Sequence, residues 1–382
     1  MTSLSGRLAA GCLGVALSLT GSGAIEAASG RATTTPIQES PRFLWGDGTP
    51  YYLATSEVAQ SAALAETAAN PNVPLWSGSF THQTRTFAYT MVGTDPALGS
   101  ATTTIPVVIV PLKLIFYGPL TTLSASNPVC GDTMSATTLA LDSPLFQPYP
   151  FLPGGTDVGT TQYIDAFQRA NFWSDVSTVA PDYHVLLSPT VAPTQTVLIP
   201  KFLGSTVADP CSRIGKVSYL YFDLVLRRMI DRLAIPPTSL PLFVAYNTFL
   251  TQGGQCCVLG YHSVRSGGQT YAFASYNDAG VFNVPIEDVH AMSHELAEWL
   301  DDPFGVNPTP GWKGGQAVNC QFNLEVGDPV TGIAFDAPLN GTTYHPEDLV
   351  FLPWFARETP SSSVNGWYTF LDSYAAPPAV CP

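Results

Sequence analysis

Residues 290–302 read HAMSHELAEWLDD and have the spacing of an amphipathic helix. His290, His294 and Glu298 follow one another at intervals of one helical turn, so their side chains line one face. Pro285 opens this segment and Pro303 closes it, which predicts a helix over residues 285–302. The apolar side chains fall on another face and are expected to pack in the core; they are those of Val289, Met292, Leu296, Trp299 and Leu300.

The polar face of this helix has the pattern of a metal site. In H-E-x-x-H zinc peptidases, two histidines one turn apart hold the metal, and the glutamate after the first activates its water. Here the pattern from residue 294 is H-E-x-x-E. It predicts zinc held by His294 and Glu298, with Glu295 as general base. His290 and His294 form an alternative ligand pair, in which Glu298 orients a ligand or becomes a third one.

The predicted site needs a further ligand, because catalytic zinc takes three protein ligands and leaves one position open. The downstream segment Leu324-Glu325-Val326-Gly327-Asp328 offers Glu325 and Asp328 for this role, and His290 is the alternative. Asp301 and Asp302 lie nearer, but Asp302 before Pro303 is also typical of a helix end. Since no methionine follows Met292, the Met-turn of metzincins is absent, which argues against that subgroup.

Each of these features also has an interpretation without a metal. A row of His and Glu on a helix is usually a solvated face with ordinary side-chain pairs. His262 on a predicted strand and His345 in a predicted loop could bind metal or substrate, but a structural role is favoured for both. Three observations favour the metal: His290 shares the face, an acidic pair follows, and two of the six histidines lie in this helix.

Outward from the helix, the sequence predicts strands, then helices, then further strands. We expect a strand region over Thr102–Phe116 that prolines break, helices over 160–176 and 216–233, and strands over 242–249, 258–264 and 270–276. This order predicts an α+β fold. Its expected form is a zincin-like mixed sheet with an active-site helix and an irregular, disulfide-bearing C-terminal lobe.

The N-terminus has the features of a secretory signal peptide over residues 1–27. Arg7 precedes an apolar stretch of small residues, and Ile25-Glu26-Ala27 offers a cleavage site. Residues 28–45 are predicted to be a flexible lead-in, and residues 46–382 a single domain. Within it we expect a β-rich lobe to about residue 284, the helix over 285–302 and a C-terminal lobe over 303–382. The mature protein is therefore expected to be extracellular or periplasmic, with no membrane insertion after the signal is removed.

Cysteine usage agrees with export. An even set in an exported chain predicts disulfides rather than buried free thiols. Cys256 and Cys257 are adjacent, and we expect them to bond to different partners. The cysteines beyond the predicted signal peptide are Cys130, Cys211, Cys256, Cys257, Cys320 and Cys381.

The charge balance excludes one class of partner. The chain has 15 Lys and Arg against 29 Asp and Glu, for a formal net charge of −14. Binding of nucleic acid needs clustered basic residues that neutralise phosphates, and no such cluster exists. We therefore expect no nucleic-acid partner, and the sequence does not predict the oligomeric state.

Several segments together resemble the exordium-like, phosphate-induced protein family and its bacterial secreted relatives. The resemblance covers roughly residues 190–381. In bacterial members the S-H-E-x-x-E segment followed by D-P implies a zinc-peptidase-like centre. In plant members this segment is degraded, and those proteins are linked to cell-wall growth signalling without an established activity. The segments are Gly260-Tyr261-His262-Ser263 after Cys256-Cys257, Ser293-His294-Glu295-Leu296-Ala297-Glu298, Asp302-Pro303, Gly311-Trp312 and Leu324-Glu325-Val326-Gly327-Asp328.

These observations predict a secreted zinc-dependent metallopeptidase-like protein. It would hydrolyse peptide bonds of an extracellular peptide or protein through a metal-activated water. Because glutamate replaces the second histidine of the motif, the alternative is a non-catalytic extracellular or cell-wall binding or signalling protein of the exordium-like type.

Overall fold

The computed structural model describes residues 72–209, 211–252, 255–315, 319–379 and 381. Within them the chain is mixed α/β, with helices and several sheets, so the prediction of a mixed fold is confirmed at that level. The predicted signal peptide and lead-in lie outside the described residues. The α-helices are α2 (Ala136–Asp142), α3 (Tyr163–Asn171), α4 (Trp173–Val176), α5 (Tyr219–Arg232), α6 (His290–Asp301) and α7 (Leu352–Ala356).

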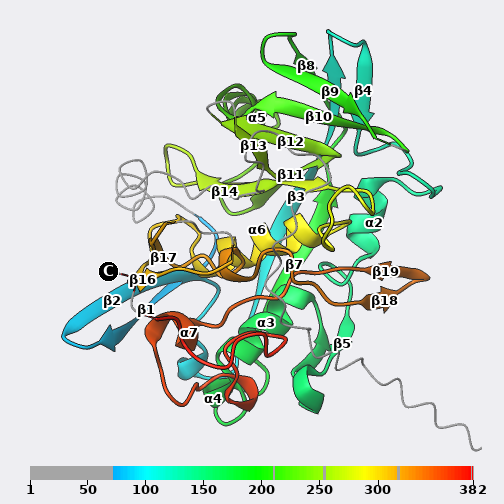
Figure 1. Ribbon diagram of the computed structural model, residues 1–382. Coiled ribbons are helices and arrows are strands. Elements are labelled where there is room, and N and C mark those ends of the chain that lie inside the picture. The colour runs from blue at the N-terminus through cyan, green and yellow to red at the C-terminus, as the bar shows by residue number, and fades with distance from the viewer. Residues whose placement is uncertain (1–71, 210, 253–254, 316–318, 380, 382) are drawn as a thin grey trace, which may run out of the picture.

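A seven-stranded sheet forms the centre of the molecule (Figure 1). Its main order is β14-β15-β11-β3-β4, and β7 and β8 also pair with β3. The β15, β11 and β3 strands run parallel, whereas β14 is antiparallel to β15. The strands are β3 (Thr102–Phe116), β4 (Thr121–Ser124), β7 (His184–Val191), β8 (Gln195–Ile199), β11 (Leu240–Tyr246), β14 (Gly260–Val264) and β15 (Thr270–Tyr276).

The β3 strand is continuous over Thr102–Phe116, so the prediction that Pro106 and Pro111 break it is wrong. Pro106 precedes the stretch that pairs with β11, and Pro111 lies between the stretches that pair with β7 and β8. Each proline therefore lies where one side of β3 has no partner strand among the described residues, and its missing N–H interrupts no ladder there.

A four-stranded sheet with the order β13-β12-β10-β9 lies beside the first. The predicted strand over 242–249 is in fact divided between β11 and β12, which belong to different sheets. Asn247 separates them with a φ of 44°, a left-handed conformation that ends a strand. The strands are β9 (Gly204–Ala208), β10 (Arg213–Ser218), β12 (Thr248–Gln252) and β13 (Gln255–Val258).

Several other boundaries differ from the predictions. The predicted helix over 160–176 is two helices, α3 and α4, which meet at Phe172, whose backbone is not helical. The helix predicted over 216–233 begins at Tyr219, because residues up to Ser218 belong to β10. The strand predicted over 258–264 is likewise divided between β13 and β14.

Two-stranded sheets and loops make up most of the remainder, including the segment after residue 302 (Figure 1). The β16–β17 and β18–β19 hairpins and the short α7 helix follow α6 there. The strands of these small sheets are β1 (Leu75–His82), β2 (Arg85–Val92), β5 (Tyr149–Phe151), β6 (Gly159–Thr161), β16 (Pro308–Trp312), β17 (Gln321–Asn323), β18 (Ala337–Leu339) and β19 (Thr342–Tyr344).

The six cysteines beyond the predicted signal peptide form three disulfides: Cys130–Cys211, Cys256–Cys257 and Cys320–Cys381. The prediction of disulfides is confirmed, but the expectation that the adjacent cysteines take different partners is wrong. Cys256 and Cys257 bond to each other, because the remaining four cysteines already lie in two pairs with Cα atoms 5.9 Å apart, a normal disulfide spacing.

Among the described residues, no helix has both the length and the apolar character needed to cross a membrane.

Candidate functional site

The α6 helix begins at His290, five residues later than the predicted start at Pro285. Asp288 has a φ of 41°, and its backbone pairs with Asn277 in an isolated bridge, so the chain before Val289 cannot be helical. The end is close to the prediction, since Asp302 is the C-cap and Pro303 follows it. The H-E-x-x-E segment therefore lies wholly within a regular helix.

Every residue of α6 is buried. The helix packs against β15 and β14 of the central sheet on one side and against α3 and β2 on others. Its apolar face lies in the main core as predicted, and the Trp299 indole N–H donates to Thr270 Oγ1 of β15 at 2.9 Å. The polar face is not solvated, which excludes the ordinary surface interpretation of the His and Glu row.

His294 is held in one orientation by an acidic partner on each ring nitrogen. Its Nδ1 lies 2.6 Å from Glu347 Oε2, and its Nε2 lies 3.1 Å from Glu298 Oε1 and 3.7 Å from Asp328 Oδ1. Ser293 fixes the segment that carries Glu347, because its hydroxyl accepts the Glu347 backbone N–H at 2.9 Å. A carboxylate on one imidazole nitrogen, with the other directed at further acids, is the usual environment of a histidine that ligates a metal.

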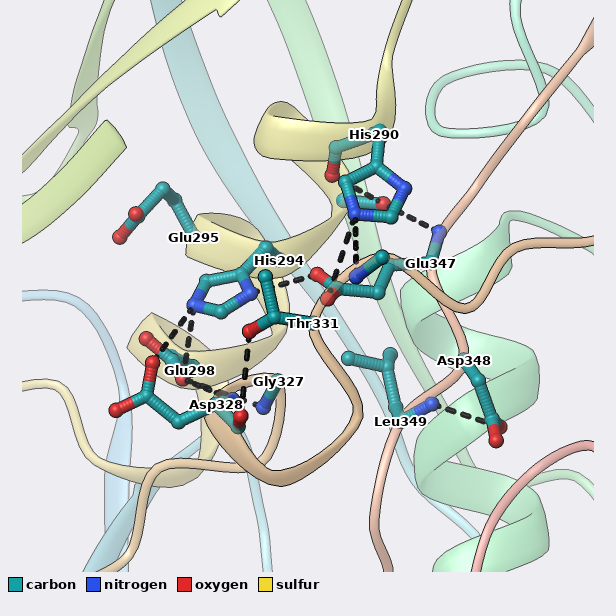
Figure 2. A network of polar contacts seen from close by, with 12 residues as sticks. His290, His294, Glu295, Glu298, Gly327, Asp328, Thr331, Glu347, Asp348 and Leu349 are labelled. Carbon is teal, nitrogen blue, oxygen red and sulfur yellow. Dashed lines mark hydrogen bonds and ion pairs between the residues drawn. The ribbon is translucent and has the colours of Figure 1, made fainter. Parts of the chain in front are cut away.

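The predicted downstream segment reaches the helix at Glu298. The backbone N–H groups of Gly327 and Asp328 donate to Glu298 Oε1 at 3.2 and 3.3 Å. Figure 2 shows Asp328 and Glu298 together beside the ring of His294. Asp328, predicted as a third ligand, is therefore brought to the predicted His294–Glu298 pair.

His262 comes from β14 and faces the same carboxylates from the sheet side. Its Nδ1 lies 3.4 Å from Glu295 Oε2 and 3.7 Å from Glu298 Oε2, and its Nε2 lies 3.9 Å from Glu325 Oε2. Glu325, the other predicted third ligand, is thus placed near His262 rather than near His294. Asn323 donates to Glu325 Oε1 at 2.6 Å and fixes this carboxylate.

Two groups of potential ligands result, and they share Glu298. His294, Glu295 and Glu298 form one group, and His262, Glu298 and Glu325 form the other, with ligand atoms within 4.8 Å of one another in each. All five side chains are buried. We name these five residues the α6 cluster.

His290 is not brought into either group. Its Nε2 lies 3.4 Å from Glu347 Oε1 and accepts the Gly332 N–H at 3.4 Å. Figure 2 shows the carboxylate of Glu347 between the rings of His290 and His294. The two histidines therefore share a carboxylate partner instead of facing a common point, which does not favour the predicted His290–His294 ligand pair.

Burial and like charges dominate the electrostatics of the α6 cluster. Burial raises the pKa of Glu295 to about 7, against the hydrogen bond from His262. Burial, together with the charge of Glu298, raises the pKa of Glu325 well above its usual value. Burial would also raise the pKa of Glu298, but the adjacent His294 lowers it overall. One carboxyl in the cluster is thus poised near neutral pH, where a general base is most effective.

Two glycines allow these side chains to pack so closely. A Cβ on Gly327 would lie 2.6 Å from Cε1 of the His294 ring, and a Cβ on Gly260 would lie 2.6 Å from Glu295 Oε1. Both distances are shorter than any normal van der Waals contact. The two glycines therefore make room for the imidazole and for the carboxylate, respectively.

A second set of acidic and histidine side chains lies where the chain enters α6. Glu287, Asp288 and His345 place potential ligand atoms within 4.8 Å of one another. His345 Nδ1 lies 2.6 Å from Asp288 Oδ2 and 3.3 Å from Glu287 Oε1. We name these three residues the loop cluster. Its side chains are between 11% and 22% exposed, so water reaches them.

Sequence reasoning missed two residues of the site. It favoured a structural role for His262, and it did not consider Glu347, although it singled out the neighbouring His345. A signal existed for Glu347, because acidic partners of metal-ligating histidines are a general feature of such sites. Nothing in the local pattern around residue 347 identifies which histidine it would meet.

Comparison of the chain with models of known families, with curated proteins and with solved structures gives no match.

Proposed function

We propose that the chain is a secreted, zinc-dependent hydrolase of the metallopeptidase type that cleaves peptide bonds in extracellular peptides or proteins. The observation that carries the proposal is the environment of His294. Glu347 engages one ring nitrogen, and the other is directed at Glu298 and Asp328. Without an ion, this is a costly concentration of buried and partly buried acids around one histidine of α6.

The donor atoms fit a zinc ion. Imidazole nitrogen and carboxylate oxygen are both ordinary zinc ligands, and a catalytic site uses three of them. His294, Glu298 and Asp328 would hold the ion, and Glu347 would orient the His294 ring. The Asp328 side chain is 23% exposed, whereas those of His294 and Glu298 are at most 3% exposed. Substrate would therefore approach from the Asp328 side.

The position of α6 against the mixed sheet also supports the proposal. The α6 helix packs beneath β14, which is the last strand in the sheet order and antiparallel to its neighbour. A mixed sheet over a helix that carries the metal-binding pattern supports a zincin-like fold, which we include in the proposal. It also supports the resemblance to the bacterial exordium-like proteins.

Glu295 would act as the general base. Zinc, when bound, polarises the scissile carbonyl and lowers the pKa of water at the site. The Glu295 carboxylate would accept the proton from the attacking water and deliver it to the leaving amine. Its pKa of about 7 suits both transfers. His262 would keep the carboxylate in place by donating from Nδ1 to Oε2.

One observation favours the alternative of a non-catalytic binding or signalling protein. Glu295 has no exposed surface, and its Oε1 faces the backbone of Gly260. A base that water cannot reach would leave the site with a structural metal only.

Metal analysis of the purified chain, followed by a casein and peptide-library assay of Glu295→Gln, tests the proposal. We expect the variant to retain zinc and to lose hydrolysis by at least about 100-fold, the usual contribution of a general base. Glu358→Gln, a change of an exposed glutamate outside the site, is the matched control and should be fully active.

Three outcomes would count against the proposed function or its mechanism. Folded protein without metal, or Glu295→Gln with full activity, would contradict the proposed mechanism. Zinc retained by both proteins with no turnover in either would support the non-catalytic alternative.

A further inference from the structure

We propose that the site is dinuclear, with Glu298 bridging two divalent cations. His294, Glu298 and Asp328 would hold the first, and His262, Glu298 and Glu325 the second. The inference rests on the metal centre of the proposed function, but it adds a second cation that the proposed function does not require.

The bridge follows from where the two Glu298 oxygens point. Oε1 lies 3.1 Å from Nε2 of His294, whereas Oε2 lies on the side of the His262 ring, 3.7 Å from its Nδ1. Glu298 also places a ligand atom within 4.8 Å of ligand atoms of His262 and Glu325. The two imidazoles belong to different elements, α6 and β14, and approach the carboxylate from different sides. In two-metal sites the ions lie close enough for one carboxylate to bind both through its separate oxygens. Glu298 has that arrangement.

Unpartnered buried atoms indicate the position of the second cation. Among the described residues, His262 Nε2 and Glu325 Oε2 have no hydrogen-bond partner, although both side chains are only 2% exposed. Buried polar atoms are almost always paired, because leaving one unpaired costs its full desolvation. These two atoms lie 3.9 Å apart, and together with Glu298 they form a group of potential ligands. A cation between them would satisfy both.

The other polar atoms of these two side chains are already engaged. Asn323 donates to Glu325 Oε1, and Glu295 Oε2 lies within hydrogen-bond distance of His262 Nδ1. Each side chain is therefore held through one atom, while the atom facing the other side chain is left available. This is how surrounding residues orient the ligands of a bound metal.

Charge balance points to the same number of cations. Five carboxylates meet two imidazoles here: those of Glu295, Glu298, Glu325, Asp328 and Glu347. With neutral imidazoles, a single divalent cation would leave a formal charge of −3 in a mostly buried space, whereas two would leave only −1. Uncompensated like charges in a buried site are strongly unfavourable.

Metal stoichiometry tests the proposal without reference to activity. The full chain would be equilibrated with Zn²⁺, and bound zinc per chain measured by plasma mass spectrometry. We expect two equivalents for the wild type, one for His262→Ala, and loss of both high-affinity sites in Glu298→Ala. His82→Ala, which removes a histidine at the end of β1 far from these ligands in sequence, should still bind two.

A second, more conservative variant keeps the proposal testable if His262→Ala fails to fold. Glu325→Gln preserves the size of the side chain and should weaken the second site by at least about 10-fold, as loss of a ligand does. Electron paramagnetic resonance of the cobalt-loaded protein is an independent readout. Magnetic coupling between two Co²⁺ ions is expected in the wild type, and isolated Co²⁺ in Glu325→Gln.

One equivalent or none in the wild type would overturn the proposal, as would equal stoichiometry in the wild type and in folded His262→Ala and Glu325→Gln. These results can be separated from failure of the proposed function. One zinc with hydrolysis that depends on Glu295 would disprove the second site alone. Two zinc ions without hydrolysis would disprove the enzyme alone.

Discussion

The α6 cluster and the loop cluster contain the same types of side chain and differ in what surrounds them. Both bring histidine and carboxylate atoms within 4.8 Å of one another. In the loop cluster, His345 is paired directly with Asp288, and the side chains are partly exposed to water. In the α6 cluster, burial is nearly complete, and His262 Nε2 and Glu325 Oε2 lack hydrogen-bond partners within the part of the chain that the structure describes. The comparison teaches that burial and unpaired ligand atoms, more than residue type, favour the α6 cluster over the loop cluster as the proposed metal site.

The largest expected effect is stabilisation of the α6 cluster by zinc. A ligand that binds only the folded state at about 1,000 times its dissociation constant stabilises it by about 4 kcal/mol. We therefore expect added zinc to raise the thermal unfolding midpoint of the wild type by several degrees, and chelation to reverse the change. In Glu298→Gln the increase should be nearly absent. Differential scanning calorimetry with and without zinc measures both.

The loop cluster provides the control for this experiment. His345→Ala removes its only imidazole and should leave the zinc-induced increase unchanged. If His345→Ala abolished the increase while Glu298→Gln preserved it, the assignment of the metal to the α6 cluster would be wrong.

An intermediate effect is expected when the close packing of the α6 cluster is disturbed. In Gly327→Ala the new methyl group would collide with the His294 ring. Gly327 has a φ of −89°, so the backbone itself accepts alanine and the cost is steric. Overpacking of this kind typically costs about 1–3 kcal/mol, and displacement of the ring should also weaken zinc binding. Urea unfolding and zinc titration measure the two consequences.

Gly118→Ala is the matched control, because its Cβ would make only an ordinary contact, 3.6 Å from Lys201 Cγ. If Gly327→Ala were as stable as Gly118→Ala and bound zinc normally, the ring of His294 would not be held as the structure has it.

The smallest effect is expected in the loop cluster, as a dependence of stability on pH. The hydrogen bond to Asp288 raises the pKa of His345 above its usual value, although burial opposes this. A raised histidine pKa contributes stability that is complete below the unfolded pKa of about 6.5 and is lost as the pH rises through the folded value. Because the ring is partly exposed, we expect His345→Gln to cost less than about 1 kcal/mol, and only at low pH.

Urea unfolding at about pH 5 and about pH 9 measures this difference, with His82→Gln as a control for loss of an imidazole. A larger cost of His345→Gln at about pH 9 than at about pH 5 would contradict the predicted sign.

The sequence was most informative where the site depends on local spacing. The one-turn interval of His294 and Glu298, the core face with Trp299 and the end of the helix near Pro303 all follow from helical periodicity. The predicted start of α6 was wrong because Asp288 has a left-handed backbone and pairs with Asn277, just beyond the end of β15, which the local sequence pattern does not indicate.

The remaining partners could not be predicted, because tertiary structure brings them together. Glu347 reaches His294 from 53 residues along the chain, and His262 reaches Glu295 from 33 residues away. No periodicity links such positions. The segment containing Glu325 and Asp328 was found as an acidic pair, but the division of its carboxylates between two histidines depends on how that loop crosses the helix.

The two glycines at the site indicate which related chains could form the same site. A chain can retain H-E-x-x-E by chance, since the pattern fixes only three positions of one helix. Gly260 and Gly327 lie on separate segments, and each leaves space for one side chain of the proposed site on that helix. A distant relative with bulkier residues at both positions could not seat the imidazole and the carboxylate as this protein does. We therefore expect glycine at both positions in related chains that keep the whole proposed site, but not in chains that keep only the H-E-x-x-E pattern.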